Sequence, residues 1–147
     1  GLARASGELE APALPAGGSP AALSLLEAPL TQTGAIMGTP AYMAPEQHEG
    51  RPATAASDQF AFCVSLYEGL YGRHPFDITS LAALIGDVIG GRVAPPPTGS
   101  RVPARIFRAL QRGLAVAGEA RWPSMGELFA ELSRDPEARR RRVLAST

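Results

Sequence analysis

Hydrophobic residues recur at helical spacing in the second half of the chain. The strongest segment, residues 57–72, opens with the capping residue Ser57 and the acidic Asp58, and it stops at Gly72. Apolar side chains face nearly every side of this segment, so we expect a helix that runs through the middle of a core. The same spacing predicts further helices over residues 80–89, 103–115 and 124–133. The pattern therefore predicts a mainly α-helical fold.

The first 56 residues lack a regular hydrophobic pattern. Residues 5–30 are rich in Ala and Pro, and their scattered prolines exclude a long helix, so we expect this stretch to be flexible. A short helix over residues 21–26 would be marginal without tertiary support. Residues 31–56 are also irregular, although Pro45 favours one or two helical turns through His48.

Composition narrows the classes of function. The 147 residues suffice for one domain, and the 14 basic and 14 acidic residues cancel, which argues against a nucleic-acid partner. The single cysteine, Cys63, cannot form an intrachain disulfide and is interpreted as a small buried thiol. Neither His48 nor His74 has zinc-type spacing to another ligand, so we predict no metal site.

Short motifs along the chain carry a family resemblance. They are Gly38-Thr39-Pro40, Ala44-Pro45-Glu46, the Ser57-Asp58 start of the apolar helix, Arg73-His74-Pro75-Phe76 and Ala120-Arg121-Trp122-Pro123-Ser124. In this order the chain resembles the C-terminal lobe of a bacterial serine/threonine protein kinase of the eukaryotic-like family, in which A-P-E closes the activation segment. Residues 1–4, GLAR, are similar to the end of the D-F-G-L-A-R motif of that family.

The resemblance implies a division of the chain. Residues 1–47 would be a long irregular activation segment, with a flexible insert over 5–30 and with the substrate-docking loop and A-P-E over 31–47. Residues 48–134 would form the helical C-terminal lobe of the protein-kinase fold. Residues 135–147 would form a basic flexible tail.

The implied activity is transfer of the ATP γ-phosphate to Ser or Thr of protein substrates, for which the complete kinase uses ATP and Mg²⁺. This chain contains no lysine, no asparagine and no G-x-G-x-x-G, so we expect no catalytic residue in it. Alone it should bind neither ATP nor Mg²⁺, and the missing N-terminal half of the kinase would be its partner. The alternative is a non-catalytic, pseudokinase-like protein-binding module, which the sequence upstream of Gly1 would distinguish from the enzyme.

The same resemblance implies roles for two threonines and for the substrate-docking loop. Thr31 and Thr33 lie where related kinases autophosphorylate, and a phosphate there would order a loop by pairing with arginine. An unmodified polar loop is the alternative. The pocket that receives the residue after the phosphoacceptor would be shaped by Gly38, Thr39, Pro40 and Tyr42, and Thr39 would also lie against the catalytic aspartate and favour serine or threonine as substrate.

Three charged residues are assigned supporting roles by the resemblance. Glu46 and Arg121 would meet as an ion pair that anchors the activation segment to the lower helices, the alternative being two solvated charges. Asp58 would accept hydrogen bonds from the catalytic-loop main chain. Its alternative role is to favour the helix dipole from the first turn.

The arginines at 139–142 leave two interpretations of the tail open. The first is a solvated tail of a cytoplasmic protein. The second is a segment on the cytoplasmic face of a membrane, because basic clusters often precede or follow a membrane span on that side, here one after residue 147.

Overall fold

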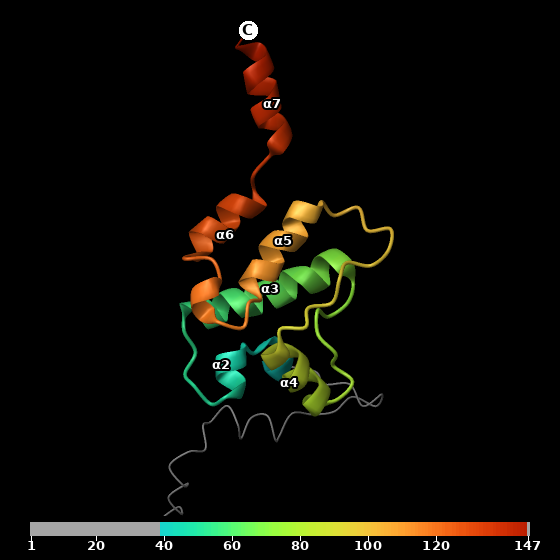
Figure 1. Cartoon of the computed structure of the whole chain (residues 1–147), viewed down its shortest axis with the longest axis vertical. Helices are drawn as coiled ribbons and strands as arrows, with labels where there is room; N and C mark the ends of the chain where they lie inside the picture. The colour runs from blue at the N-terminus through green and yellow to red at the C-terminus, as the bar shows by residue number, and fades with distance from the viewer. Residues whose placement is uncertain (1–38, 147) are drawn as a thin grey trace, which may run out of the picture.

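The structure is a computed structural model that describes residues 39–146, and these residues form helices and no strand (Figure 1). The helical fold predicted from the sequence is thereby confirmed for this part of the chain. The elements in order are η1 (Thr39–Tyr42), α2 (Pro45–His48), α3 (Ala55–Tyr71), α4 (Leu81–Gly90), α5 (Ala104–Gly113), η2 (Gly118–Ala120), α6 (Met125–Leu132) and α7 (Pro136–Ala145).

Helix α3 is the central element, as its all-round hydrophobicity predicted. Phe60, Cys63, Val64 and Tyr67 are fully buried along it. The core that surrounds them includes Leu84 and Val88 of α4, Leu110 of α5 with Leu114 just after that helix, and Leu128 of α6. Figure 1 shows α2 and α4 on one side of α3, with α5 and α6 on the other.

The start of α3 differs from the prediction. Thr54, not Ser57, is the N-cap: its Oγ1 accepts the Ser57 N–H at 3.3 Å, and Ser57 Oγ accepts the Thr54 N–H at 3.1 Å. Both residues carry hydroxyls, and the earlier one takes the cap because the second then closes a reciprocal capping box. The end agrees with the prediction, since Gly72 adopts a left-handed conformation with φ of 71°.

The tail expected over residues 135–147 contains a helix. Residues 136–145 form helix α7. The local sequence explains this, because Asp135 Oδ1 accepts the Glu137 N–H at 2.8 Å and Pro136 occupies the first turn, where its missing N–H costs nothing. The helix buries no residue and extends away from the others (Figure 1).

Within residues 39–146, no helix combines the length and the apolar character needed to cross a membrane.

Candidate functional site

The structure describes only part of the site proposed from the sequence. Gly38, Thr31 and Thr33 lie outside the described residues, as do the insert and the GLAR segment. Thr39 is the first residue of η1. Pro40 is buried, and Tyr42 is partly exposed at the end of the same element.

Histidine 74 holds η1 in place from the turn after α3. Its Nε2 lies 2.7 Å from the main-chain oxygen of Ala41, and its Nδ1 lies 3.1 Å from the main-chain nitrogen of Phe76. A tautomer with the proton on Nε2 satisfies both contacts, because Nε2–H then donates to Ala41 while Nδ1 accepts from Phe76. The Tyr42 ring packs edge-on against the imidazole, with centroids 6.0 Å apart. Sequence reasoning considered His74 as part of a family motif and as a metal ligand, and it missed this role.

Helix α2 follows η1 after a two-residue extended link and presents Glu46 in its first turn. The Ala44 N–H donates to Gln47 Oε1 at 3.1 Å, which satisfies a donor at the start of this short helix. Ala44 and Pro45 are buried beneath it. The direction of the Glu46 side chain is thus set by a locally capped turn seated on the core.

The structure brings Glu46 and Arg121 together. Arg121 Nη1 donates to Glu46 Oε1 at 2.7 Å, and Nη2 donates to Oε2 at 2.9 Å. The Arg121 side chain is fully buried and that of Glu46 is 12% exposed. This two-point geometry is the one in which arginine binds a carboxylate most strongly.

Every donor of the buried guanidinium has a partner. Besides Glu46, it donates to the main-chain oxygens of Ala115 at 2.8 Å, Val116 at 3.1 Å and Ala56 at 3.0 Å. Arginine has five side-chain donor hydrogens, so the desolvation cost of burying the charge is met by hydrogen bonds. Through these bonds Arg121 joins α2, the start of α3 and the segment after α5.

The same contacts control the ionisation of Glu46. Burial alone would raise its pKa, but the hydrogen bonds from Arg121, from the main chain and from Ser57 outweigh burial and lower the pKa to about 2. The Ser57 hydroxyl donates to Oε1 at 2.8 Å. Glu46 is therefore charged throughout the physiological range.

A second polar connection, which sequence reasoning missed, lies beside the ion pair. Gln59 is buried in α3, its Nε2 donates to the Trp122 carbonyl at 2.9 Å, and its Oε1 accepts the Trp122 N–H at 2.9 Å. The indole Nε1–H of Trp122 donates to the Ala109 carbonyl at 2.9 Å. The Arg112 guanidinium covers the indole ring at 4.1 Å. The segment that carries Arg121 is thus held to both α3 and α5.

Glu68 is a further residue that sequence reasoning missed. The Glu68 carboxylate and the burial of the Tyr42 hydroxyl both raise the pKa of that hydroxyl. Within the described part, Glu68 Oε1 is buried and has no hydrogen-bond partner. The signal in the sequence was a single acidic residue in the second half of an otherwise apolar helix. Its carboxylate places negative charge next to η1.

Asp58 lies in the first turn of α3 and is exposed. Its carboxylate forms no hydrogen bond with residues 39–146. This position is compatible with the helix-dipole role and leaves the carboxylate accessible to main-chain donors from elsewhere.

The remaining polar candidates do not form a metal centre. Residues 39–146 contain no group of three or more His, Cys, Asp or Glu side chains that could hold a metal ion. Both ring nitrogens of His48 are buried without a hydrogen-bond partner in this part of the chain, and burial lowers its pKa. Burial raises the pKa of the Cys63 thiol to about 12, which supports the interpretation of a structural cysteine.

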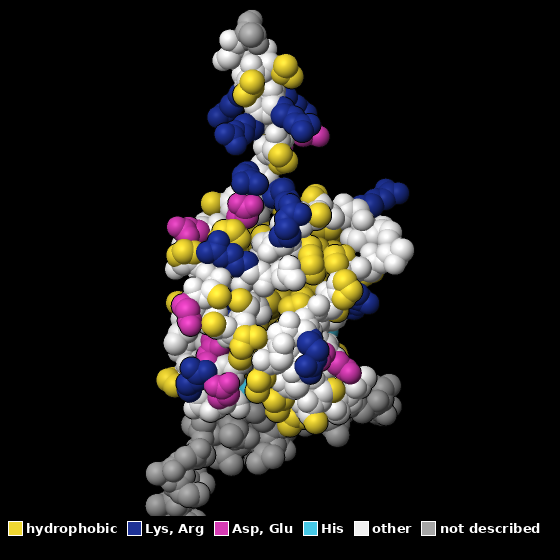
Figure 2. All heavy atoms as spheres, in the orientation of Figure 1, with side chains coloured by type: hydrophobic (Ala, Val, Ile, Leu, Met, Phe, Trp, Pro, Cys, Tyr) yellow, Lys and Arg dark blue, Asp and Glu magenta, His cyan; other side chains and the backbone are white. Residues whose placement is uncertain are grey.

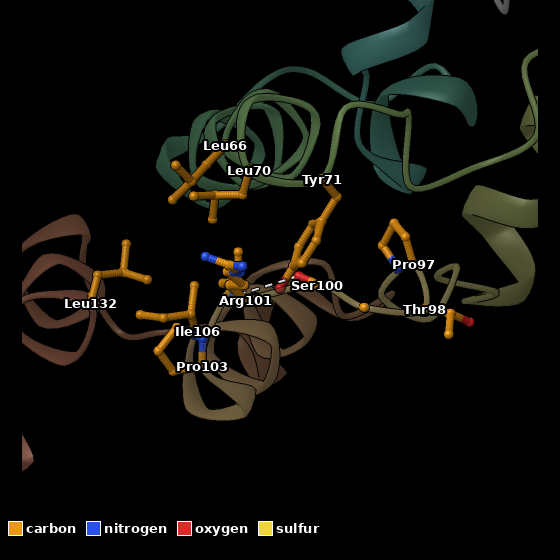
Figure 3. Close-up of a pocket in the computed structure, with 12 residues that line it drawn as sticks. Leu66, Leu70, Tyr71, Pro97, Thr98, Ser100, Arg101, Pro103, Ile106 and Leu132 are labelled. Carbon is orange, nitrogen blue, oxygen red and sulfur yellow. Dashed lines mark hydrogen bonds between the residues drawn. The ribbon is translucent and has the colours of Figure 1, made fainter.

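A cavity of about 710 Å³ lies where the end of α3 faces the 97–103 segment, α5 and α6 (Figure 3). Its walls include Leu66, Leu70, Ile106 and Leu132, and Figure 3 shows Arg101 between them. The buried Tyr71 hydroxyl has no hydrogen-bond partner among the described residues. No residue of η1 or α2 lines this cavity, so it is separate from these two elements.

The sequence also matches known proteins. It is 40% identical over 101 residues to the serine/threonine-protein kinase Pkn1 of Myxococcus xanthus, covering 66% of this chain and 14% of that protein. It is 36% identical over 106 residues to the probable serine/threonine-protein kinase PkwA of Thermomonospora curvata, covering 72% of this chain and 14% of that protein. No protein-family model matches the chain.

The chain belongs to the bacterial serine/threonine protein kinase family. It spans about a seventh of the length of these two kinases. Its helices correspond to the helical C-terminal lobe of the kinase fold. One relative, MasK of Myxococcus xanthus, is named a tyrosine-protein kinase. It is 34% identical to this chain over 102 residues, which cover 69% of this chain and 16% of MasK. Membership of the family alone therefore does not determine which hydroxyl accepts the phosphate.

Proposed function

We propose that this chain supplies the activation segment and the helical substrate-docking platform of a protein serine/threonine kinase. The complete kinase would transfer the γ-phosphate of ATP to Ser or Thr of protein substrates. The observation that carries the proposal is the two-point Glu46–Arg121 ion pair, which ties the A-P-E glutamate to the segment before α6. Its residues are those that the kinase resemblance pairs.

The geometry supports docking rather than chemistry as the contribution of this chain. His74 contacts the Ala41 carbonyl, and Glu46 ties α2 to Arg121, so the loop between these two contacts is fixed at both ends. A substrate segment that lay along η1 would meet Tyr42 and the neighbouring negative charge of Glu68. Holding a substrate in one orientation is a large part of what a kinase does to accelerate phosphoryl transfer.

The residues of this chain do not fit an ATP or magnesium site. The chain has no lysine and no asparagine, and residues 39–146 lack a cluster of carboxylates and histidines for a metal. We therefore propose that ATP, Mg²⁺ and the catalytic base are held by the rest of the kinase. The exposed carboxylate of Asp58 would accept main-chain hydrogen bonds from the catalytic loop of that part.

Regulation by phosphorylation is proposed for Thr31 and Thr33, upstream of η1. Incubation of the full-length protein with ATP followed by mass spectrometry should find phosphate on at least one of them. If both stay unmodified while the protein phosphorylates a substrate, this form of regulation is ruled out.

A chimaera tests the docking proposal. Residues 39–134 would replace the matching segment of Pkn1, and the product would be assayed with ATP on serine, threonine and tyrosine peptides. We expect the chimaera to phosphorylate serine or threonine peptides, and His74→Ala in it to raise KM for the peptide more than it lowers kcat, because η1 loses its anchor. ATP binding by the chimaera serves as the folding control.

The same experiment addresses the pseudokinase-like alternative. A chimaera that binds ATP and a substrate protein but transfers no phosphate would favour a non-catalytic protein-binding module. The 147-residue chain alone should label no substrate with phosphate, and labelling by it would overturn the division of roles proposed here.

A further inference from the structure

Helix α7 concentrates the positive charge of the chain. Five arginines and two acidic residues lie from Arg134 to Ser146, whereas the 14 basic and 14 acidic residues of the whole chain cancel. The remainder therefore carries a small negative excess. Figure 2 shows the arginines of α7 as dark blue groups on both sides of the projecting helix.

The exposure of α7 leaves this charge available to a partner. No residue of the helix is buried, and its two largest apolar side chains, Val143 and Leu144, are 67% and 78% exposed. Arg141 forms an exposed pair with Glu137 at 3.3 Å, a contact that contributes little in water. Arg139 and Arg140 form no ion pair with another described residue.

Arginine and apolar side chains lie together on one face of α7. A shallow groove on it is lined by Pro136, Arg139, Arg140, Val143 and Leu144, together with the two residues that precede the helix. Arg139 precedes Val143 by four residues and Arg140 precedes Leu144 by four, so each guanidinium lies beside an apolar side chain. On this face arginine and apolar side chains therefore alternate, with Arg140 between Val143 and Leu144.

We propose that α7 binds the surface of an anionic phospholipid bilayer. The arginines match the phosphate layer, and the exposed Val143 and Leu144 beside them match the boundary between headgroups and acyl chains. A nucleic acid would also attract the arginines but would leave Val143 and Leu144 in water, because its outer surface is phosphate. The inference needs no membrane span after residue 147 and does not rest on phosphoryl transfer.

Vesicle sedimentation of the 147-residue chain tests the proposal. We expect binding to vesicles of phosphatidylglycerol and phosphatidylcholine, no binding to pure phosphatidylcholine, and release as salt is raised, because salt screens the attraction. Each arginine near an anionic surface contributes about fivefold to binding, so Arg139→Gln with Arg140→Gln should weaken binding about 25-fold. Main-chain amides of residues 137–145 should exchange more slowly on the anionic vesicles.

Two further variants make the result specific to α7. Arg101→Gln with Arg108→Gln removes the same charge from exposed positions outside α7 and should leave binding nearly unchanged. Val143→Ser with Leu144→Ser should weaken vesicle binding without altering any charge. Circular dichroism of each variant should match that of the unmodified chain, because no substituted residue is buried.

Three outcomes would overturn the proposal. Equal binding to neutral and anionic vesicles would exclude recognition of the phosphate layer. An equal loss in the control pair would mean that total charge, and not α7, is responsible. Preference for duplex DNA over anionic vesicles, with no effect of the serine substitutions, would assign the helix to nucleic acid.

Discussion

Arg121 and Glu46 lie 75 residues apart and meet through two parallel hydrogen bonds of 2.7 and 2.9 Å. The pair joins α2, the short helix after η1, to the segment before α6. Because the guanidinium is fully buried, its charge depends on Glu46 for neutralisation. The contact is therefore a condition for the fold as well as a support for the loop.

Removing either partner should destabilise the protein. Glu46→Ala and Arg121→Ala should each lower the free energy of unfolding by about 3 to 5 kcal/mol, because each leaves the other charge buried without its partner. Urea denaturation of the two single variants and the double variant forms a double-mutant cycle that isolates the pair. We expect a coupling energy well above 1 kcal/mol, roughly the upper value for exposed ion pairs.

The exposed pair of Arg51 and Glu49 is the matched control. Its side chains are 65% and 45% exposed, and its closest atoms are 2.6 Å apart. The same cycle on this pair should give a coupling energy of about 0 to 1 kcal/mol. Equal coupling in the two cycles would mean that burial of Arg121 does not strengthen its bond to Glu46.

The pH dependence of stability should report the ionisation of Glu46. Its pKa lies at about 2 in the folded protein, below the usual value of 4.5. A depressed folded pKa means that the carboxylate contributes stability above about pH 4.5 and loses that contribution as the pH falls toward 2. Denaturation of the unmodified chain and of Glu46→Gln from neutral to acidic pH measures the contribution.

The informative quantity is the difference in free energy of unfolding between the unmodified chain and Glu46→Gln. The unmodified chain should be the more stable at neutral pH, and the difference should shrink between about pH 4.5 and 2 as Glu46 is protonated. Other carboxylates titrate in both proteins and cancel in this comparison. A difference that stays constant over that range would contradict the assignment of the low pKa to Glu46.

Helix periodicity was enough to predict the core but not its polar connections. The apolar positions of residues 57–72 predicted α3 and its central burial, because hydrophobic spacing is a local property. Gln59 gave no comparable signal, since an isolated glutamine in a helix suggests a solvated position. Its two bonds to Trp122 depend on a contact 63 residues away, which only the folded chain provides.

The helix cap and the contact at η1 were likewise not predictable from local sequence alone. Ser57 and Thr54 carry the same capping chemistry, so the sequence did not determine which would open the helix; the reciprocal bond between them did. His74 appeared as part of a short motif, while its bond to Ala41 requires the turn after α3 to reach back to η1. Family resemblance supplied what periodicity could not, as in the pairing of Glu46 with Arg121.

The close approach of α3 and α5 at Cys63 and Gly113 should make position 113 intolerant of a side chain. A Cβ atom at Gly113 would overlap Cys63 Sγ. Gly113→Ala should therefore lower the free energy of unfolding by about 1 to 3 kcal/mol, a typical cost of overpacking. Thermal or urea denaturation measures it. Adding Cys63→Ala should recover part of the loss, because the smaller side chain makes room.

A glycine elsewhere in α3 provides the control for that substitution. Nothing lies within 4 Å of a Cβ built at Gly69. Gly69→Ala should raise stability by about 0.5 to 1 kcal/mol, because alanine loses less conformational entropy in a helix. If Gly113→Ala were also neutral or stabilising, the two helices would have room for a methyl group beside Cys63.

Cys63 should act as a reporter of unfolding. Burial raises the pKa of its thiol from 9.0 to about 12, so the reactive thiolate is rare in the folded protein at pH values where alkylating reagents are used. We expect iodoacetamide to label the folded chain much more slowly than the chain in urea, because burial both disfavours the thiolate and excludes the reagent. Glu46→Ala should accelerate labelling in the absence of urea, because the destabilised chain unfolds more often. Labelling of the folded chain at the rate seen in urea would show instead that Cys63 is accessible and that the core around α3 is open.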